Sequence, residues 1–252
     1  MYGEIDTGSL TLVRDLKSPE IDDDYRMRNA GDNLLDGEGF NYTSQNTGKH
    51  SFSFTTLAAT IGAGGIITNS GSITTTTTGL TFGTHAMFPV GGAQTTVCET
   101  SVAFTTQPTA NVLIDFGLFQ RGASTAFAPL DGVYFRLSPS GLNGVINSGG
   151  VESTTTGTMP FTYANNATNR YLIQLTNTRT TFWVNNTKVG EIPTPTSLNF
   201  PCKSQSLPWS FRHAIQGGAA GTVLQAVFSD YRVISRGSVF SDSFAQVTSR
   251  IV

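Results

Sequence analysis

The chain has little charge for its length. Of its 252 residues only 13% are Asp, Glu, Lys or Arg, and the formal net charge is −2, whereas a typical domain is about 25% charged. A nucleic-acid-binding surface needs clustered Lys and Arg, and a disordered chain combines low hydrophobicity with high net charge. Here 38% of the residues are hydrophobic and seventeen are Phe. The composition therefore predicts a folded protein with no nucleic-acid partner. It suits a protein packed among neighbours, since interface cores are depleted of charge, and it equally suits a neutral β protein that is simply soluble.

Cysteine and long apolar runs are also scarce. Cys98 and Cys202 are the only two cysteines, and their separation fits no metal motif. We expect two buried thiols in a protein made in a reducing cytoplasm, rather than a disulfide. No run approaches the ~18 apolar residues of a membrane span, and the first residues lack the apolar core of a signal peptide. The sequence thus predicts neither membrane insertion nor secretion.

A helical apolar period is missing as well, and short β-rich runs take its place. The stretch Arg170–Pro193 shows this most clearly, because three such runs are separated by Asn177 and by Asn185-Asn186. Asparagine tolerates the left-handed conformation that tight turns require. Trp183 lies in an apolar alternation and is expected in the core. Many short strands between such turns predict an all-β sandwich or jelly roll.

Further strands are predicted on both sides of that stretch. The dense apolar run at 111–119 indicates a central strand, 151–156 an outer strand and 223–234 a closing core strand. The Thr tract at 72–78 is expected to be a strand with an exposed threonine face. The remaining predicted strands are 50–55, 57–61, 95–105, 132–137, 142–147 and 207–214.

The two ends of the chain differ from the middle. Residues 1–33 carry much of the charge, and we expect an N-terminal arm that orders against a partner. Residues 34–237 are predicted to form the sandwich, and the Ser-rich residues 238–252 a C-terminal tail. The apolar arm residues expected to contact the partner are Leu10, Leu12, Val13, Leu16 and Tyr25.

The order of the strands resembles concanavalin A-like, laminin-G-type jelly rolls. Val112–Phe119 leads to Asp131–Arg136, then to Tyr171–Leu175, and then to Phe182-Trp183-Val184-Asn185-Asn186. The last run is similar to the family's aromatic-x-Val-Asn-Gly turn, with Asn186 where glycine often stands. The resemblance covers residues 34–235 and implies a concanavalin A-like jelly-roll sandwich.

A narrower resemblance is to structural proteins of tailed bacteriophages. It rests on Asp32–Leu35, Phe40-Asn41 and Met87–Pro89, with a Thr/Ser/Gly-rich strand pair between them. It implies a capsid decoration or cement protein, assembled in the bacterial host cytoplasm, whose arm binds the major capsid protein or other virion proteins in a multi-copy or homo-oligomeric assembly. The alternative is a carbohydrate- or receptor-binding module of a phage tail or fibre.

Catalytic residues are not expected. Concanavalin-like glycosidases carry a Glu-x-Asp-x-x-Glu strand whose paired carboxylates, about 5–5.5 Å apart, serve as nucleophile and acid. Glu4-Ile5-Asp6 and Glu20-Ile21-Asp22 begin that pattern, but both lie in the predicted arm and neither completes it. None of the three histidines lies in a nucleophile motif. We therefore expect a non-enzymatic protein.

Two kinds of ligand remain to be considered. Calcium would need several loop oxygens, and Asp131 is the only loop acid in a suitable place, so we expect no metal and no cofactor. A cell-surface glycan could stack on an exposed aromatic ring beside amide donors. Tyr163, with Asn165 and Asn166 next to it, is the predicted glycan contact.

Overall fold

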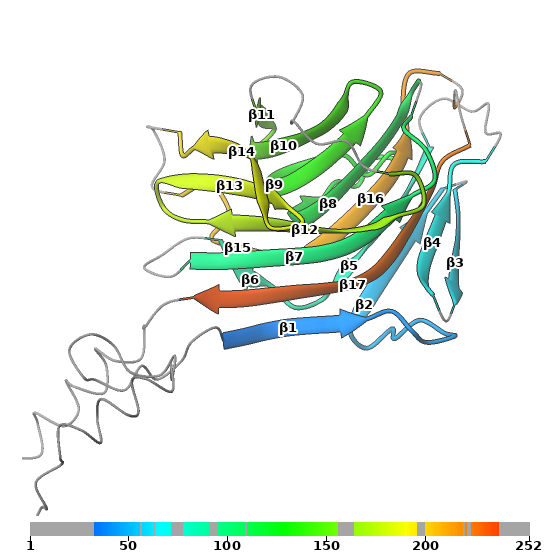
Figure 1. Ribbon diagram of the computed structural model, residues 1–252, viewed down its shortest axis with the longest axis horizontal. Helices are drawn as coiled ribbons and strands as arrows, with labels where there is room; N and C mark the ends of the chain where they lie inside the picture. The colour runs from blue at the N-terminus through cyan, green and yellow to red at the C-terminus, as the bar shows by residue number, and fades with distance from the viewer. Residues whose placement is uncertain are drawn as a thin grey trace, which may run out of the picture.

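The computed structural model shows an all-β sandwich of two large antiparallel sheets (Figure 1). Within the part of the chain that the structure describes, the long elements are all strands and none is a helix, so no helix there could span a membrane. The predicted fold class is confirmed. The described residues are 33–55, 57–62, 64–71, 78–90, 95–108, 110–155, 164–195, 200–218, 220 and 223–236.

One sheet has eight strands in the order β14-β13-β12-β7-β17-β4-β3, and β1 also pairs with β17. Its strands are β1 (Asn33–Gly39), β3 (Ala58–Gly62), β4 (Gly65–Asn69), β7 (Thr95–Phe104), β12 (Thr168–Leu175), β13 (Arg179–Val184), β14 (Thr187–Pro193) and β17 (Gln225–Arg236).

The other large sheet has seven strands in the order β11-β10-β9-β8-β16-β5-β2. They are β2 (His50–Phe54), β5 (Thr78–Thr84), β8 (Val112–Arg121), β9 (Pro129–Ser138), β10 (Gly141–Ser148), β11 (Val151–Thr154) and β16 (Trp209–Ile215). A small third sheet pairs β6 (Phe88–Pro89) with β15 (Ser206–Leu207). The apolar run at 111–119 does form the middle strand, β8, and the run at 151–156 contains the edge strand, β11, as predicted.

Aromatic rings join the two sheets through the core. Alternate residues of a strand point to opposite faces, so β16 directs Trp209 and Phe211 toward β17 on the facing sheet. The ring of Phe211 stacks on Phe228 with 4.1 Å between centroids, and Trp209 stacks on Tyr231 at 4.3 Å. Both pairs belong to the buried apolar cluster and bring β16 of one sheet against β17 of the other.

The stretch Arg170–Pro193 forms the predicted meander of β12, β13 and β14, but the prediction for Trp183 is wrong. Phe182 and Val184 point into the core and are fully buried, so the period of two places Trp183 on the opposite face, where it is partly exposed. The turn that follows has φ of 48° at Asn185 and 65° at Asn186, the left-handed pair of a type I′ hairpin.

The structure describes both cysteines but not the predicted tail or most of the predicted arm and Thr tract. Cys98 and Cys202 are both buried and free, as expected. Residues 72–77 of the Thr tract lie outside the described residues, and β5 begins at Thr78. The predicted arm contacts Leu10, Leu12, Val13, Leu16 and Tyr25, and the predicted tail at 238–252, also lie outside them.

Candidate functional site

A row of polar side chains crosses the outer face of the seven-stranded sheet. Phe116 on β8 and Phe135 on β9 point into the core, so the residues beside them point outward. The strand registers then place the outward residues of five neighbouring strands opposite one another. In order from β10 to β5 they are Asn143, Arg136, Asp115, Arg212 and Thr81.

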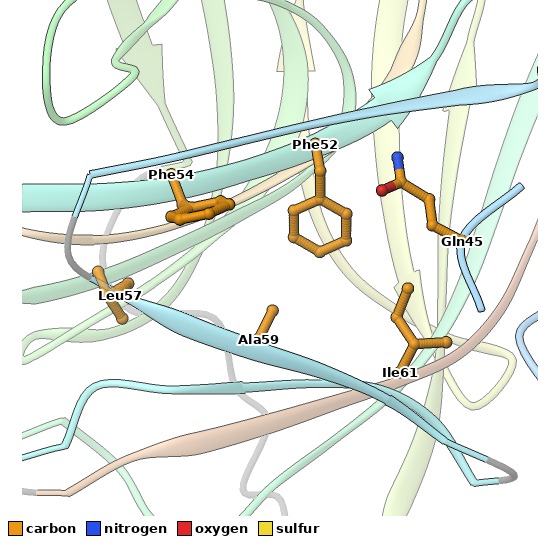
Figure 2. Close-up of a pocket in the computed structure, with 6 residues that line it drawn as sticks. All are labelled: Gln45, Phe52, Phe54, Leu57, Ala59 and Ile61. Atoms are coloured by element: carbon orange, nitrogen blue, oxygen red, sulfur yellow. The ribbon is translucent and has the colours of Figure 1, made fainter. Parts of the chain in front are cut away.

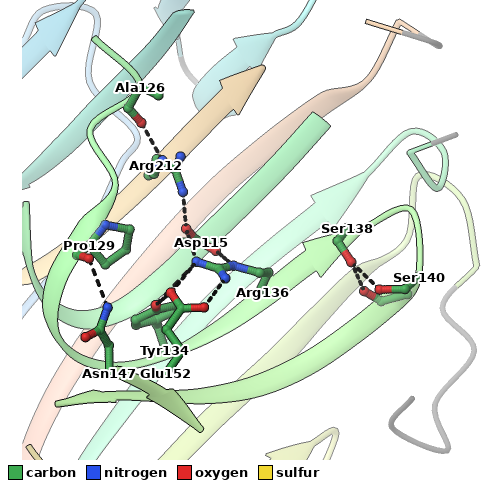
Figure 3. Close-up of polar contacts among 11 residues, drawn as sticks. Asp115, Ala126, Pro129, Tyr134, Arg136, Ser138, Ser140, Asn147, Glu152 and Arg212 are labelled. Atoms are coloured by element: carbon green, nitrogen blue, oxygen red, sulfur yellow. Dashed lines mark hydrogen bonds and ion pairs between the residues drawn. The ribbon is translucent and has the colours of Figure 1, made fainter. Parts of the chain in front are cut away.

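Asp115 is the centre of this row, and it lies between two guanidinium groups (Figure 3). Arg136 donates from Nε to Oδ1 over 2.7 Å and from Nη2 to Oδ2 over 3.2 Å. On the other side, Nη1 of Arg212 donates to Oδ2 over 2.7 Å. The Asp115 side chain has no exposed surface, and a buried carboxylate is tolerated only when it is paired and hydrogen-bonded. The two arginines meet that need.

Glu152 on the edge strand β11 holds the outer side of Arg136. Its Oε2 accepts from Nη1 at 2.7 Å, and its Oε1 accepts from Nη2 at 3.1 Å. The hydroxyl of Tyr134 donates to Oε1 over 2.7 Å, and the Arg136 guanidinium lies 5.3 Å from the centre of the Tyr134 ring. Burial, with the negative charges of Asp115 and Glu152, raises the pKa of Tyr134, so the phenol remains a donor.

The electrostatics of this network favour a fixed, charged Arg136. Burial alone would lower its pKa, but Asp115 outweighs that effect by charge and hydrogen bonding, and the pKa is raised. The network contains two arginines and two carboxylates, so its formal charges cancel. The result is a hydrogen-bonded group of charged side chains with no net formal charge.

A hollow of about 400 Å³ opens beside Arg136 over β9, β10 and β11. Most of its described lining carries hydroxyl or amide groups, which both donate and accept hydrogen bonds. Two of them, Ser138 at the end of β9 and Ser140 in the turn that follows, lie side by side with 2.7 Å between their hydroxyl oxygens (Figure 3). The lining residues are Arg136, Ser138, Ser140, Asn143, Val145, Thr154 and Thr155.

A second hollow, of about 390 Å³, has the opposite character (Figure 2). It lies between β2 and β3, the edge strands of the two sheets, where the apolar interior reaches the surface. Among its described lining residues only Gln45 is polar; the others are Phe52, Phe54, Leu57, Ala59 and Ile61. A polar ligand would find few partners there, so the hollow beside Arg136 is the better candidate site.

Of the residues singled out from the sequence, those that the structure describes do not line this hollow. Asn165 and Asn166 are exposed in a turn before β12, which belongs to the other sheet, and Tyr163 lies outside the described residues. Their role as a glycan contact stays a prediction. Asp131 accepts backbone N–H bonds from Gly149 and from Lys203 and Ser204, and it thereby joins two loops.

No sequence motif reveals the network, because Asp115 and Glu152 are single acids on separate strands, β8 and β11. One signal was present: Asp115 interrupts the apolar run 112–119 of β8, and Arg136 interrupts the apolar run 133–137 of β9. A charge at such a position needs a partner on a neighbouring strand. Among the described residues, no group of three or more His, Cys, Asp or Glu side chains could hold a metal ion.

Comparison with known proteins finds likeness in structure alone. No family model and no curated sequence matches the chain. The endo-1,3-beta-glucanase from Streptomyces sioyaensis is similar, with a TM-score of 0.63 and 11% identity over 82% of this chain and 98% of that one. The endo-beta-1,3-glucanase from Pyrococcus furiosus gives 0.61 and 14% over 81% and 95%. The Emp47p carbohydrate recognition domain gives 0.56 and 12% over 87% and 99%.

These neighbours correct one expectation. The prediction of a non-enzymatic protein is contradicted, because two of the three structures are named as glucanases. All three are named for carbohydrates and none for a virion. At such low identity the likeness establishes the fold: the chain is a concanavalin A-like jelly roll.

Proposed function

We propose that this protein binds a carbohydrate in the hollow beside Arg136. The observation that carries the proposal is the arrangement of hydroxyl and amide side chains around a guanidinium whose charge is already neutralised. A sugar presents many hydroxyl groups, and each can donate and accept. A pocket of fixed, uncharged donors and acceptors suits such a ligand, because few precisely placed polar groups provide orientation.

The network beneath the hollow supports binding by keeping these groups in place. Arg136 is held on one edge by buried Asp115 and on the other by Glu152, so its side chain is already ordered before a ligand arrives. Binding then costs less conformational entropy than it would on mobile surface side chains. The fold likeness to glucanases and to a carbohydrate recognition domain favours the same class of ligand.

The test is a glycan array that includes β-1,3-glucan oligosaccharides, followed by calorimetric titration of the best ligand. Asn143→Ala removes an amide from the lining and is expected to weaken binding roughly 3- to 10-fold, the value of one hydrogen bond. Asn165→Ala, in the exposed turn of the other sheet, is the matched control and should bind like the wild type.

The same binding measurements also test two other possibilities: that the glycan binds at the turn before β12, and that the protein cleaves the glycan. Loss of binding in Asn165→Ala or Tyr163→Ala, with Asn143→Ala unaffected, would place the glycan at the turn before β12 instead. Shortened oligosaccharides in the incubation would show that the protein cleaves what it binds. No binding to any glycan would contradict the proposal.

The setting of this activity is a separate proposal that rests on the resemblance to phage proteins and on the scarcity of charge. A carbohydrate-binding module fits a phage tail or fibre better than a capsid decoration protein. Residues 1–33 would attach it to other virion proteins. Deleting them should abolish virion attachment and leave the β-rich circular dichroism spectrum intact; attachment that survives the deletion would refute this role.

A further inference from the structure

We propose that Glu152 determines which glycans enter the hollow, by occupying the outer edge of Arg136 and so excluding anionic sugars. The inference rests on the proposed carbohydrate-binding function. Of the described residues that line the hollow, only Arg136 is charged. Arginine recognises carboxylate groups through two parallel N–H bonds, so the availability of its donors decides whether such a group can bind.

The two edges of the Arg136 guanidinium differ in how deeply they are held. The inner edge faces Asp115, whose side chain is completely buried, through Nε and Nη2. The outer edge faces Glu152, whose side chain is 34% exposed, through Nη1 and Nη2. Glu152 therefore takes the position at the solvent side where the carboxylate of a ligand would otherwise sit.

This arrangement disfavours the binding of anionic sugars for two reasons. An anionic sugar would find the donors of Arg136 already engaged, and it would also be repelled by the charge of Glu152. A neutral sugar can bind without displacing Glu152 from Arg136, because Ser140 and Asn143 also lie in the lining and offer it hydrogen bonds. The wild-type protein should therefore prefer neutral glycans.

Removing the Glu152 charge leaves the network with a net positive charge. Two arginines then face one carboxylate, Asp115, and the outer edge of Arg136 becomes available to a ligand. Glu152 lies on the exposed edge strand β11, so a substitution there leaves the core intact. Glu152→Gln keeps the shape and removes the charge, whereas Glu152→Asp keeps the charge.

The experiment compares a β-1,3-glucan oligosaccharide with the same oligosaccharide oxidised to carry carboxylates at C6. We expect the wild type and Glu152→Asp each to bind the neutral form at least tenfold more tightly than the carboxylated form. Glu152→Gln should bind the carboxylated form about tenfold more tightly than the wild type does, and that gain should shrink as salt is added. Glu191→Gln is the matched control, since Glu191 is a similarly exposed strand glutamate paired with Lys188 at 2.7 Å, and it should behave like the wild type.

Two results would overturn the inference, and they are distinguishable. If the neutral form binds but Glu152→Gln discriminates as the wild type does, Glu152 does not set specificity, while carbohydrate binding stands. If neither form binds any of the proteins, the proposed function fails and the inference fails with it. Overlapping thermal unfolding curves for the wild type and Glu152→Gln confirm that the comparison concerns binding.

Discussion

Arg212 donates a hydrogen bond from Nη1 to Oδ2 of Asp115 over 2.7 Å, and both side chains are almost completely buried. Arg212 also donates from Nε to the backbone carbonyl of Ala126. This pair links the side chains of β16 and β8, and it holds in place the carboxylate that also accepts from Arg136. The outer face of the seven-stranded sheet thus depends on a charge pair that water does not reach.

Removing the negative charge of Asp115 should be strongly destabilising. Asp115→Asn leaves Arg212 and Arg136 facing a neutral amide, and breaking a buried ion pair in this way costs about 3–5 kcal/mol. Urea unfolding followed by circular dichroism measures the loss. Asp230→Asn is the matched control, because Asp230 is partly exposed and accepts a hydrogen bond from Ser101; we expect a cost of about 1 kcal/mol or less. Equal costs for the two variants would contradict the account.

The stacked pair of Phe211 and Phe228 should carry much of the contact between the sheets. Phe211→Ala removes a fully buried ring that lies 4.1 Å from its partner, and such truncations cost about 3–5 kcal/mol. Phe54→Ala offers the comparison, since Phe54 is 66% exposed at the open edge of the sandwich. Its unfolding midpoint in urea should stay close to that of the wild type.

Stability should fall as the pH is lowered from about 6.5 toward 4. Burial, strengthened by the charge of Arg212, lowers the pKa of His213 to about 3. Burial also lowers the pKa of His50 to about 4, although Glu38 opposes the shift. Between these values and about 6.5 the unfolded chain binds protons that the folded protein does not bind, which costs about 1.4 kcal/mol per pH unit for each histidine. Urea midpoints at pH 7 and pH 4.5 measure the slope; equal midpoints would contradict the shifts.

Neither thiol should react while the protein is folded. Burial raises the pKa of the Cys202 thiol to about 12 and also raises that of Cys98, and the thiolate is the reactive form. A colorimetric thiol reagent at pH 8 should therefore detect no thiol in the native protein and two in urea. Rapid labelling of the native protein would show that one of these side chains is accessible.

The strands were predictable because their signals are local. The apolar run of β8 and the Asn185-Asn186 turn need no knowledge of the rest of the chain. Trp183 shows the limit: both faces of β13 carry large side chains, and only pairing with β12 and β14 decides which face is inward. A single residue of register exchanges the two faces.

The site was less predictable because it is made by pairing between strands. Asp115, Arg136 and Glu152 lie on β8, β9 and β11, and no short motif links them. The sequence likewise favoured a capsid role, although the chain shares its fold with a glucanase and with a carbohydrate recognition domain. A fold hosts many functions, and only the side chains of the site discriminate between them.

The most direct test of carbohydrate binding beside Arg136 is an NMR titration of the full chain with a β-1,3-glucan oligosaccharide. We predict that the largest amide shift changes fall at Ser138, Ser140, Asn143 and Thr154, which line the hollow. Changes concentrated at Asn165 and Asn166, or no changes at all, would contradict the account.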